Sequence, residues 1–203
     1  MLILAAPFAS FGAGSRGDAQ RTVTSLLELR RDGVVMQNWD LSCGAAALTT
    51  LLQYQFGDTV TEREVATGLI NRDVYIANPI LVQLRQGFSL LDLKRYVDKR
   101  GYLGMGFGGM SLQDLERRAP VLIPVNITGY NHFVIFRGRL GDRVLLADPA
   151  WGNRTMTLAR FERVWIDYLD LGRVGFVVAH KGKPAGHPPA QLAPRESDFV
   201  TLN

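Results

Sequence analysis

At 203 residues, the chain is long enough to bury one substantial core, and its 47% hydrophobic and 21% charged residues are ordinary for a folded domain. The 23 Lys and Arg against 19 Asp and Glu give a formal net charge of +4, but the basic residues are scattered over helix-like segments. This spacing argues against a nucleic-acid surface, which needs a clustered basic stripe. Cys43 is the single cysteine, so an intrachain disulfide is excluded.

The first 14 residues, MLILAAPFASFGAG, form a short apolar run followed by small residues. Such a run resembles the end of a secretory signal with its cleavage region, although a basic start is missing. We therefore expect residues 1–14 to be a signal-peptide remnant and the protein to be exported to the periplasm. The alternative is a hydrophobic N-terminal strand in a cytoplasmic protein. No later run approaches the ~20 apolar residues of a membrane-spanning helix.

Residues 15–182 are expected to form one domain whose first half is mostly helical. The stretch LLELR, residues 26–30, is interpreted as an extended lead-in or first strand, and Val34–Gln37 as the end of a strand. The Ala- and Leu-rich segment that follows predicts a central buried helix from Cys43 to Phe56. Cap signals predict three further helices, which begin after Thr61, Ser89 and Ser111.

After Pro120 the pattern changes to short runs rich in Val, Ile and Phe, separated by turn residues. Gly141-Asp142 lies between two such runs and predicts a hairpin. Helices first and strands later, without alternation, indicate an α+β domain with a C-terminal antiparallel sheet. Residues 183–203 are rich in Pro and polar groups, so we expect a flexible tail.

Cys43 is predicted to lie in the first turn of its helix, directly after Ser42, a residue type that caps helices. The positive end of the helix dipole and its free N–H groups stabilise a thiolate, the reactive form of cysteine. The alternative is an inert, buried core thiol, which is the commoner fate of a free cysteine.

A nucleophilic cysteine needs a base, and the chain has three histidines. His187 lies in the Pro-rich tail and His180 ends a strand beside a lysine, so surface positions are expected for both. His132 opens the apolar strand that precedes the hairpin, and Asp148 closes the strand that follows it. An aspartate there can accept the second ring N–H and fix the tautomer of the histidine. Asp148-Pro149 as a simple turn is the alternative.

Four motifs occur in order between about Val34 and Val178. QNWDLSCGAAAL at residues 37–48 resembles the cysteine box of the double-glycine leader peptidases, which are papain-like cysteine peptidases of family C39. GFSLLDL at 87–93 is similar to the central helix entry of that family, NHFV at 131–134 to its histidine strand, and DPAWG at 148–152 to its aspartate turn. Ser42 departs from the pattern, because the family usually has an acid before the cysteine.

The resemblance implies a papain-like fold and a triad of Cys43, His132 and Asp148. It also implies that the Gln37 side chain helps to form the oxyanion hole, and that the cut follows a Gly-Gly pair in a narrow cleft. Trp39 and Trp151 flank the motifs and are either walls of that cleft or core residues. No cofactor and no metal are implied, and the glycine-rich residues 104–109 lack the lysine of a phosphate loop.

The chain is similar to stand-alone members of the family, among them periplasmic peptidases that accompany functional-amyloid export. The expected partners are therefore a peptide or protein substrate with small residues at the cut site, together with secretion or amyloid-export components. Two alternatives remain open at this point. The domain could be a catalytically weak module that docks substrates, or it could transfer the acyl group to an amine instead of water.

Overall fold

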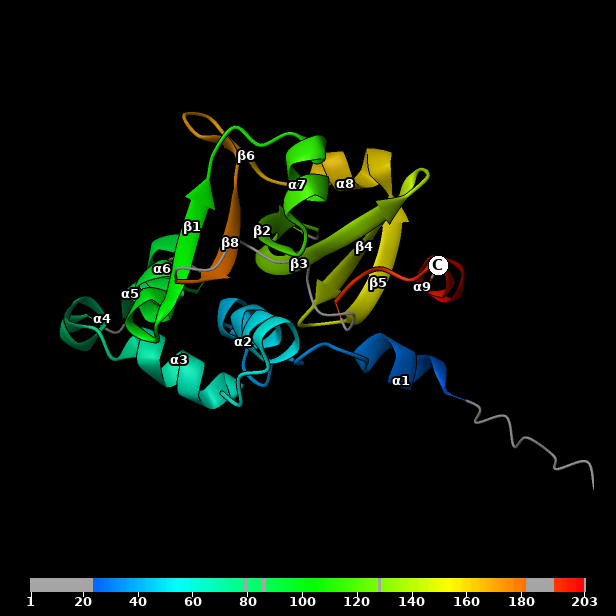
Figure 1. Ribbon diagram of the computed structural model, residues 1–203. Coiled ribbons are helices and arrows are strands. Elements are labelled where there is room, and N and C mark those ends of the chain that lie inside the picture. Colours follow the sequence, from blue (N-terminus) through cyan, green and yellow to red (C-terminus); the bar gives the residue numbers. More distant parts are fainter. Residues whose placement is uncertain (1–23, 79, 85–86, 128, 182–191, 203) are drawn as a thin grey trace, which may run out of the picture.

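The computed structural model describes residues 24–78, 80–84, 87–127, 129–181 and 192–202 (Figure 1). The expected signal-peptide remnant, residues 1–14, lies outside them. The helices are α1 (Leu26–Arg31), α2 (Cys43–Phe56), α3 (Glu62–Ile70), α4 (Asp73–Ala77), α5 (Ile80–Leu84), α6 (Leu90–Lys99), α7 (Leu112–Arg118), α8 (Leu158–Val164) and α9 (Glu196–Thr201). Within the described ranges, no helix has both the length and the apolar character needed to cross a bilayer.

The strands form a six-stranded antiparallel sheet and a separate short hairpin, which confirms the predicted α+β class. The sheet has the order β1-β8-β2-β3-β4-β5, and β6 pairs with β7. The strands are β1 (Tyr102–Phe107), β2 (Val121–Asn126), β3 (Asn131–Leu140), β4 (Arg143–Asp148), β5 (Gly152–Thr157), β6 (Asp167–Tyr168), β7 (Gly172–Arg173) and β8 (Gly175–His180). Gly141, with φ of 58°, turns the predicted hairpin between β3 and β4.

Helices cover both faces of the sheet, and successive side chains along a strand pack alternately against the helices of one face and of the other. On β3, Ile135 packs into the cluster that contains α2, α3 and α6, whereas Val134 and Phe136 pack into the cluster with α7 and α8. Successive side chains of a strand point to opposite faces, so each of these strands contributes to both cores. The sheet is therefore a fixed platform against which α2 is packed.

Two expectations for the N-terminal segment are wrong. Leu26–Arg31 is the helix α1 and not a strand, because Ser25 accepts a hydrogen bond from the Glu28 N–H while the Glu28 carboxylate accepts from the Ser25 N–H. This reciprocal cap stabilises a helix start. Val34–Gln37 has no regular secondary structure, although Val34 is buried in the core. The segment connects α1 to the loop before α2.

The flexible tail expected at residues 183–203 is also wrong for residues 192–202, which are packed on the domain. Phe199 and Leu202 contact Leu145 of β4 in a small apolar cluster. The buried Arg137 side chain donates to the Leu192 and Ala193 carbonyls at 3.0 and 3.2 Å. Burial of a guanidinium is costly without acceptors, and these carbonyls supply part of them.

Candidate active site

Cys43 is the first residue of α2 and is buried, with 2% of its surface exposed. The N-terminus of α2 comes close to β3, since a Cβ added to Gly44 would lie 3.2 Å from the Phe133 ring. Glycine at this position therefore permits the helix start to approach the strand that carries His132. The expectation that Ser42 caps α2 with its side chain is wrong, because its hydroxyl turns toward Trp39 and Glu62 instead.

His132 and Asp148 are joined across the β3–β4 pair. Ile135 is paired with Ala147, so Asp148 lies opposite Val134. Val134 and His132 are two residues apart on β3, so their side chains point to the same face of the sheet as that of Asp148. The His132 Nε2 atom lies 2.7 Å from Asp148 Oδ1. The hairpin thus brings the imidazole and the carboxylate together, as the sequence predicted.

Cys43 lies near the His132 ring and interacts with it electrostatically, and Nδ1 is the ring nitrogen left to face the sulfur because Nε2 faces Asp148. Burial of the imidazole disfavours its charged form, but the hydrogen bond to Asp148 and the interaction with Cys43 outweigh burial and raise the pKa of His132 from 6.5 to about 9. The imidazole is therefore protonated at neutral pH, where it can stabilise a thiolate beside it.

Asp148 is completely buried and its two carboxylate oxygens have separate partners. Besides His132, Oδ1 accepts the backbone N–H of Ala150 at 2.9 Å, which closes a turn around the aspartate. Oδ2 lies 3.5 Å from a guanidinium nitrogen of Arg154 on β5. These contacts offset the cost of burying a carboxylate and fix the side chain that orients the imidazole. Arg154 was not anticipated from the sequence.

Gln37 lies next to the turn that contains Asp148, because its backbone N–H donates to the Pro149 carbonyl at 2.8 Å. Its side-chain Nε2 donates to the Trp39 carbonyl at 3.2 Å, and its Oε1 is buried without a hydrogen-bond partner among the described residues. A carboxamide nitrogen carries two N–H donors, so one remains after the bond to Trp39. Residues 37–42, the cysteine loop, and residues 148–151, the aspartate turn, are therefore directly linked by a hydrogen bond.

Tyr130 also contacts the cysteine loop, and the sequence did not single it out. Its hydroxyl donates to the Asp40 carbonyl at 3.4 Å, which connects the start of the histidine strand to the cysteine loop. Burial, together with the negative potential of Cys43 and Asp40, raises the pKa of Tyr130. The phenol thus lies near Cys43.

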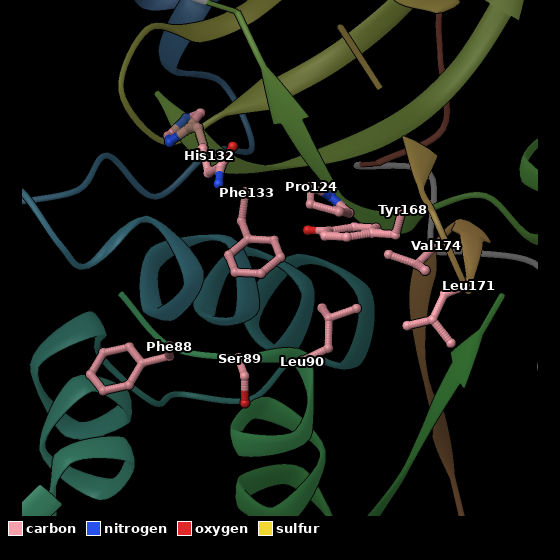
Figure 2. A pocket seen from close by; sticks show the side chains of 10 residues that line it. Phe88, Ser89, Leu90, Pro124, His132, Phe133, Tyr168, Leu171 and Val174 are labelled. Carbon is pink, nitrogen blue, oxygen red and sulfur yellow. The ribbon is translucent and has the colours of Figure 1, made fainter. Parts of the chain in front are cut away.

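His132 lines a cavity of about 310 Å³ that is otherwise largely apolar. Phe88, Ser89 and Leu90 lie across the cavity from His132, while Tyr168, Leu171 and Val174 line another side (Figure 2). Tyr168 and Leu171 belong to the short β6–β7 hairpin and its turn. A cavity of this kind suits apolar side chains of a peptide held next to the imidazole.

The structure does not bring the two predicted cleft tryptophans into that cavity. Trp39 is 45% exposed and lines a neighbouring apolar hollow of about 360 Å³, which shares Phe88 with the first. Trp151 is 66% exposed and lines another hollow, of about 370 Å³, together with Arg154. Neither tryptophan is a core residue, and Trp39 belongs to the loop that leads to Cys43.

The other two histidines do not join this group. His180 is exposed at the end of β8, where its ring packs edge-on against Phe56. His187 lies outside the described residues. Among the residues that are described, no three His, Cys, Asp or Glu side chains are grouped as metal ligands.

A helix that presents a cysteine to the histidine of an antiparallel sheet is the arrangement of a papain-like peptidase domain. The model of the peptidase C39 family matches residues 31–170. The chain belongs to this family.

Two curated relatives share substantial identity with the chain. It is 34% identical to a probable functional amyloid protease, FapD, of Pseudomonas aeruginosa over 181 residues, which cover 88% of this chain and 76% of the relative. It is 36% identical to the FapD of Pseudomonas fluorescens over 146 residues, covering 71% of this chain and 62% of that relative.

Two solved structures share the fold. The double glycine motif protease of an AMS/PCAT transporter, in complex with the leader peptide, superimposes with a TM-score of 0.57 at 23% identity, over 73% of this chain and 91% of that one. The peptidase domain of Streptococcus ComA also gives a TM-score of 0.57, at 15% identity, over 73% of this chain and 98% of that domain.

Proposed function

We propose that this protein is a cysteine endopeptidase that uses Cys43 as nucleophile, His132 as acid and base, and Asp148 as the group that orients the imidazole. The observation that carries the proposal is an imidazole held 2.7 Å from a buried carboxylate, with Cys43 at the start of α2 near enough to raise the pKa of that imidazole. In the proposed reaction, the thiolate attacks the peptide carbonyl and His132 donates a proton to the leaving amine. Water then hydrolyses the thioester, with His132 as base.

The oxyanion formed in both steps needs donors that are already in place. Gln37 retains one side-chain N–H after its bond to Trp39, and the Cys43 backbone N–H belongs to the free first turn of α2. We assign these two N–H groups to the oxyanion hole. Fixed donors of this type contribute about 3 kcal/mol of barrier lowering each.

The substrate we propose is a peptide or protein precursor cut after a Gly-Gly pair. The Tyr130 hydroxyl and the Asp40 carbonyl meet near Cys43, and we propose that they limit the size of the residues accepted at the scissile bond. The cavity lined by His132 would then hold an apolar residue of the same peptide. The double glycine motif protease with the same fold supports this choice.

We further propose a role in functional-amyloid biogenesis, on the basis of the two FapD relatives. The apolar residues 1–14 favour a periplasmic location for that role. Cell fractionation of the full chain tests the location, because a periplasmic fraction without the protein would contradict it.

The proposed activity is tested with a synthetic peptide that contains one Gly-Gly pair preceded by apolar residues. Wild-type protein is expected to cut after the second glycine, whereas Cys43→Ala and His132→Ala are expected to lose cleavage while remaining folded by circular dichroism. His180→Ala is the matched control for the histidine, and it should cleave at the wild-type rate. Cleavage by either of the first two variants would refute the proposal.

A further inference from the structure

The segment from Gln37 to Ser42 has no regular secondary structure, yet it contains Gln37 and leads directly into Cys43, which together supply the nucleophile and both proposed oxyanion donors. A loop in this position must be held in place by contacts with the rest of the domain. One end is fixed by the Gln37 N–H on the Pro149 carbonyl and the other by the start of α2. The middle is fixed by a residue of another helix, Glu62.

Glu62 is the first residue of α3 and is only 4% exposed. Its carboxylate accepts the Asn38 backbone N–H at 3.0 and 3.2 Å, the Asn38 side-chain N–H, and the Ser42 hydroxyl at 2.5 Å. A buried carboxylate is costly unless donors compensate it. Among the described residues, no Lys or Arg forms an ion pair with Glu62. All of its hydrogen-bond donors thus come from the cysteine loop.

The direction of the Ser42 hydroxyl hydrogen bond determines which donors and acceptors pair in the rest of the loop. Its oxygen lies 2.5 Å from Glu62 and 2.8 Å from the Trp39 carbonyl, but it has a single proton. The carboxylate is the stronger acceptor, so the proton is donated to Glu62. The Ser42 oxygen is then free to accept the Trp39 N–H at 3.3 Å.

This assignment leaves the Trp39 carbonyl to two other donors, the Ser42 N–H at 3.1 Å and Gln37 Nε2 at 3.2 Å. A continuous chain of hydrogen bonds therefore runs from the Glu62 carboxylate through Ser42 and Trp39 to the Gln37 carboxamide. If Glu62 could not accept the serine proton, that proton would compete with Gln37 for the Trp39 carbonyl.

We propose that Glu62 is a positioning residue, which orients the Gln37 carboxamide and the start of α2 through Asn38, Ser42 and Trp39. The inference rests on the proposed function, because it assumes that Gln37 binds the oxyanion. It also gives a physical account of Ser42, which stands where the resemblance led us to expect an acid. The carboxylate reaches this place from α3 instead.

The test compares Glu62→Gln with Glu64→Gln, which removes an exposed carboxylate from the same helix. In Glu62→Gln, an N–H group of the new amide faces the donors of Asn38 or Ser42. We expect kcat on the Gly-Gly peptide to fall about 10-fold to 100-fold, with KM within about threefold of wild type. Amide hydrogen exchange of residues 38–43 should become about tenfold faster, and Glu64→Gln should leave kcat and this exchange unchanged.

Wild-type exchange in residues 38–43 of folded Glu62→Gln would overturn the inference, as would wild-type kcat. Equal losses in both variants would also overturn it, because they would reflect the helix and not the contact. Hydrogen exchange does not depend on catalysis. A wild-type protein that failed to cut the peptide would therefore contradict the proposed function, while exchange would still show whether Glu62 holds the loop.

Discussion

His132 Nε2 lies 2.7 Å from Asp148 Oδ1, and Asp148 is held from its other sides by the Ala150 N–H and Arg154. The carboxylate is thus fixed before any substrate binds. In the proposed mechanism it accepts a hydrogen bond from the imidazole and keeps the ring turned toward Cys43.

Removal of the Asp148 side chain should therefore lower kcat by about 100-fold or more. Asp148→Asn is expected to keep a larger share of activity, because the amide oxygen can still accept the His132 N–H. Steady-state kinetics on the Gly-Gly peptide, with Asp142→Ala on the exposed turn of the same hairpin as control, measure both effects. Full activity in Asp148→Ala would contradict the orienting role.

The protonation of His132 gives a second prediction, because its pKa is raised to about 9 from an ordinary value of 6.5. The folded state binds the proton more tightly than the unfolded state, so this contribution to stability is complete below pH 6.5 and is lost as pH rises through 9. The free energy of unfolding of wild type should exceed that of His132→Ala by more at pH 6 than at pH 10. Denaturant titrations at the two values measure it.

NMR titration of the ring checks the same assignment directly. Cys43→Ala and Asp148→Ala should each lower the pKa of His132, since each removes an interaction that favours the imidazolium. An unchanged pKa in both variants would show that neither group contacts the ring in solution.

Gln37 provides a third prediction. Gln37→Ala removes a side-chain donor from the proposed oxyanion hole and should lower kcat about 100-fold, with little change in KM. Gln113→Ala, an exposed glutamine on α7, is the matched control and should behave as wild type. A loss confined to KM would assign Gln37 to substrate binding and not to the oxyanion.

The packed C-terminal segment provides a fourth prediction, which concerns stability. Phe199 is 6% exposed against Leu145, whereas its neighbour Val200 is 79% exposed. Phe199→Ala should lower the free energy of unfolding by about 3 kcal/mol, and Val200→Ala should change it little. Urea unfolding of the two variants makes the comparison, and equal stabilities would place α9 off the domain in solution.

Much of the arrangement could be predicted because it is encoded locally. The central helix from Cys43, the caps at Thr61, Ser89 and Ser111, and the turn at Gly141 were all visible as short patterns, and the structure confirms them. The cap pair Ser25 and Glu28 is an equally local pattern, and it predicts the helix α1 instead of the strand expected there.

The remaining features depend on contacts between distant parts of the chain. Glu62 contacts Ser42, which lies 20 residues earlier in the sequence, and Arg137 contacts Leu192, which lies 55 residues later. No local sequence pattern predicts such pairs. The Pro-rich sequence near the C-terminus suggested a flexible tail, whereas the buried Arg137 side chain binds Leu192 and Ala193 of that segment. Composition describes what a segment does alone, whereas these segments are ordered by partners elsewhere in the fold.

The most direct test of the account is the rate at which iodoacetamide alkylates Cys43 at pH 6, measured by mass spectrometry on folded wild type and folded His132→Ala. An imidazolium beside the sulfur predicts rapid alkylation of wild type and alkylation at least about tenfold slower in the variant. Equal rates in the two proteins would contradict the claim that the thiol and the imidazole act as a pair.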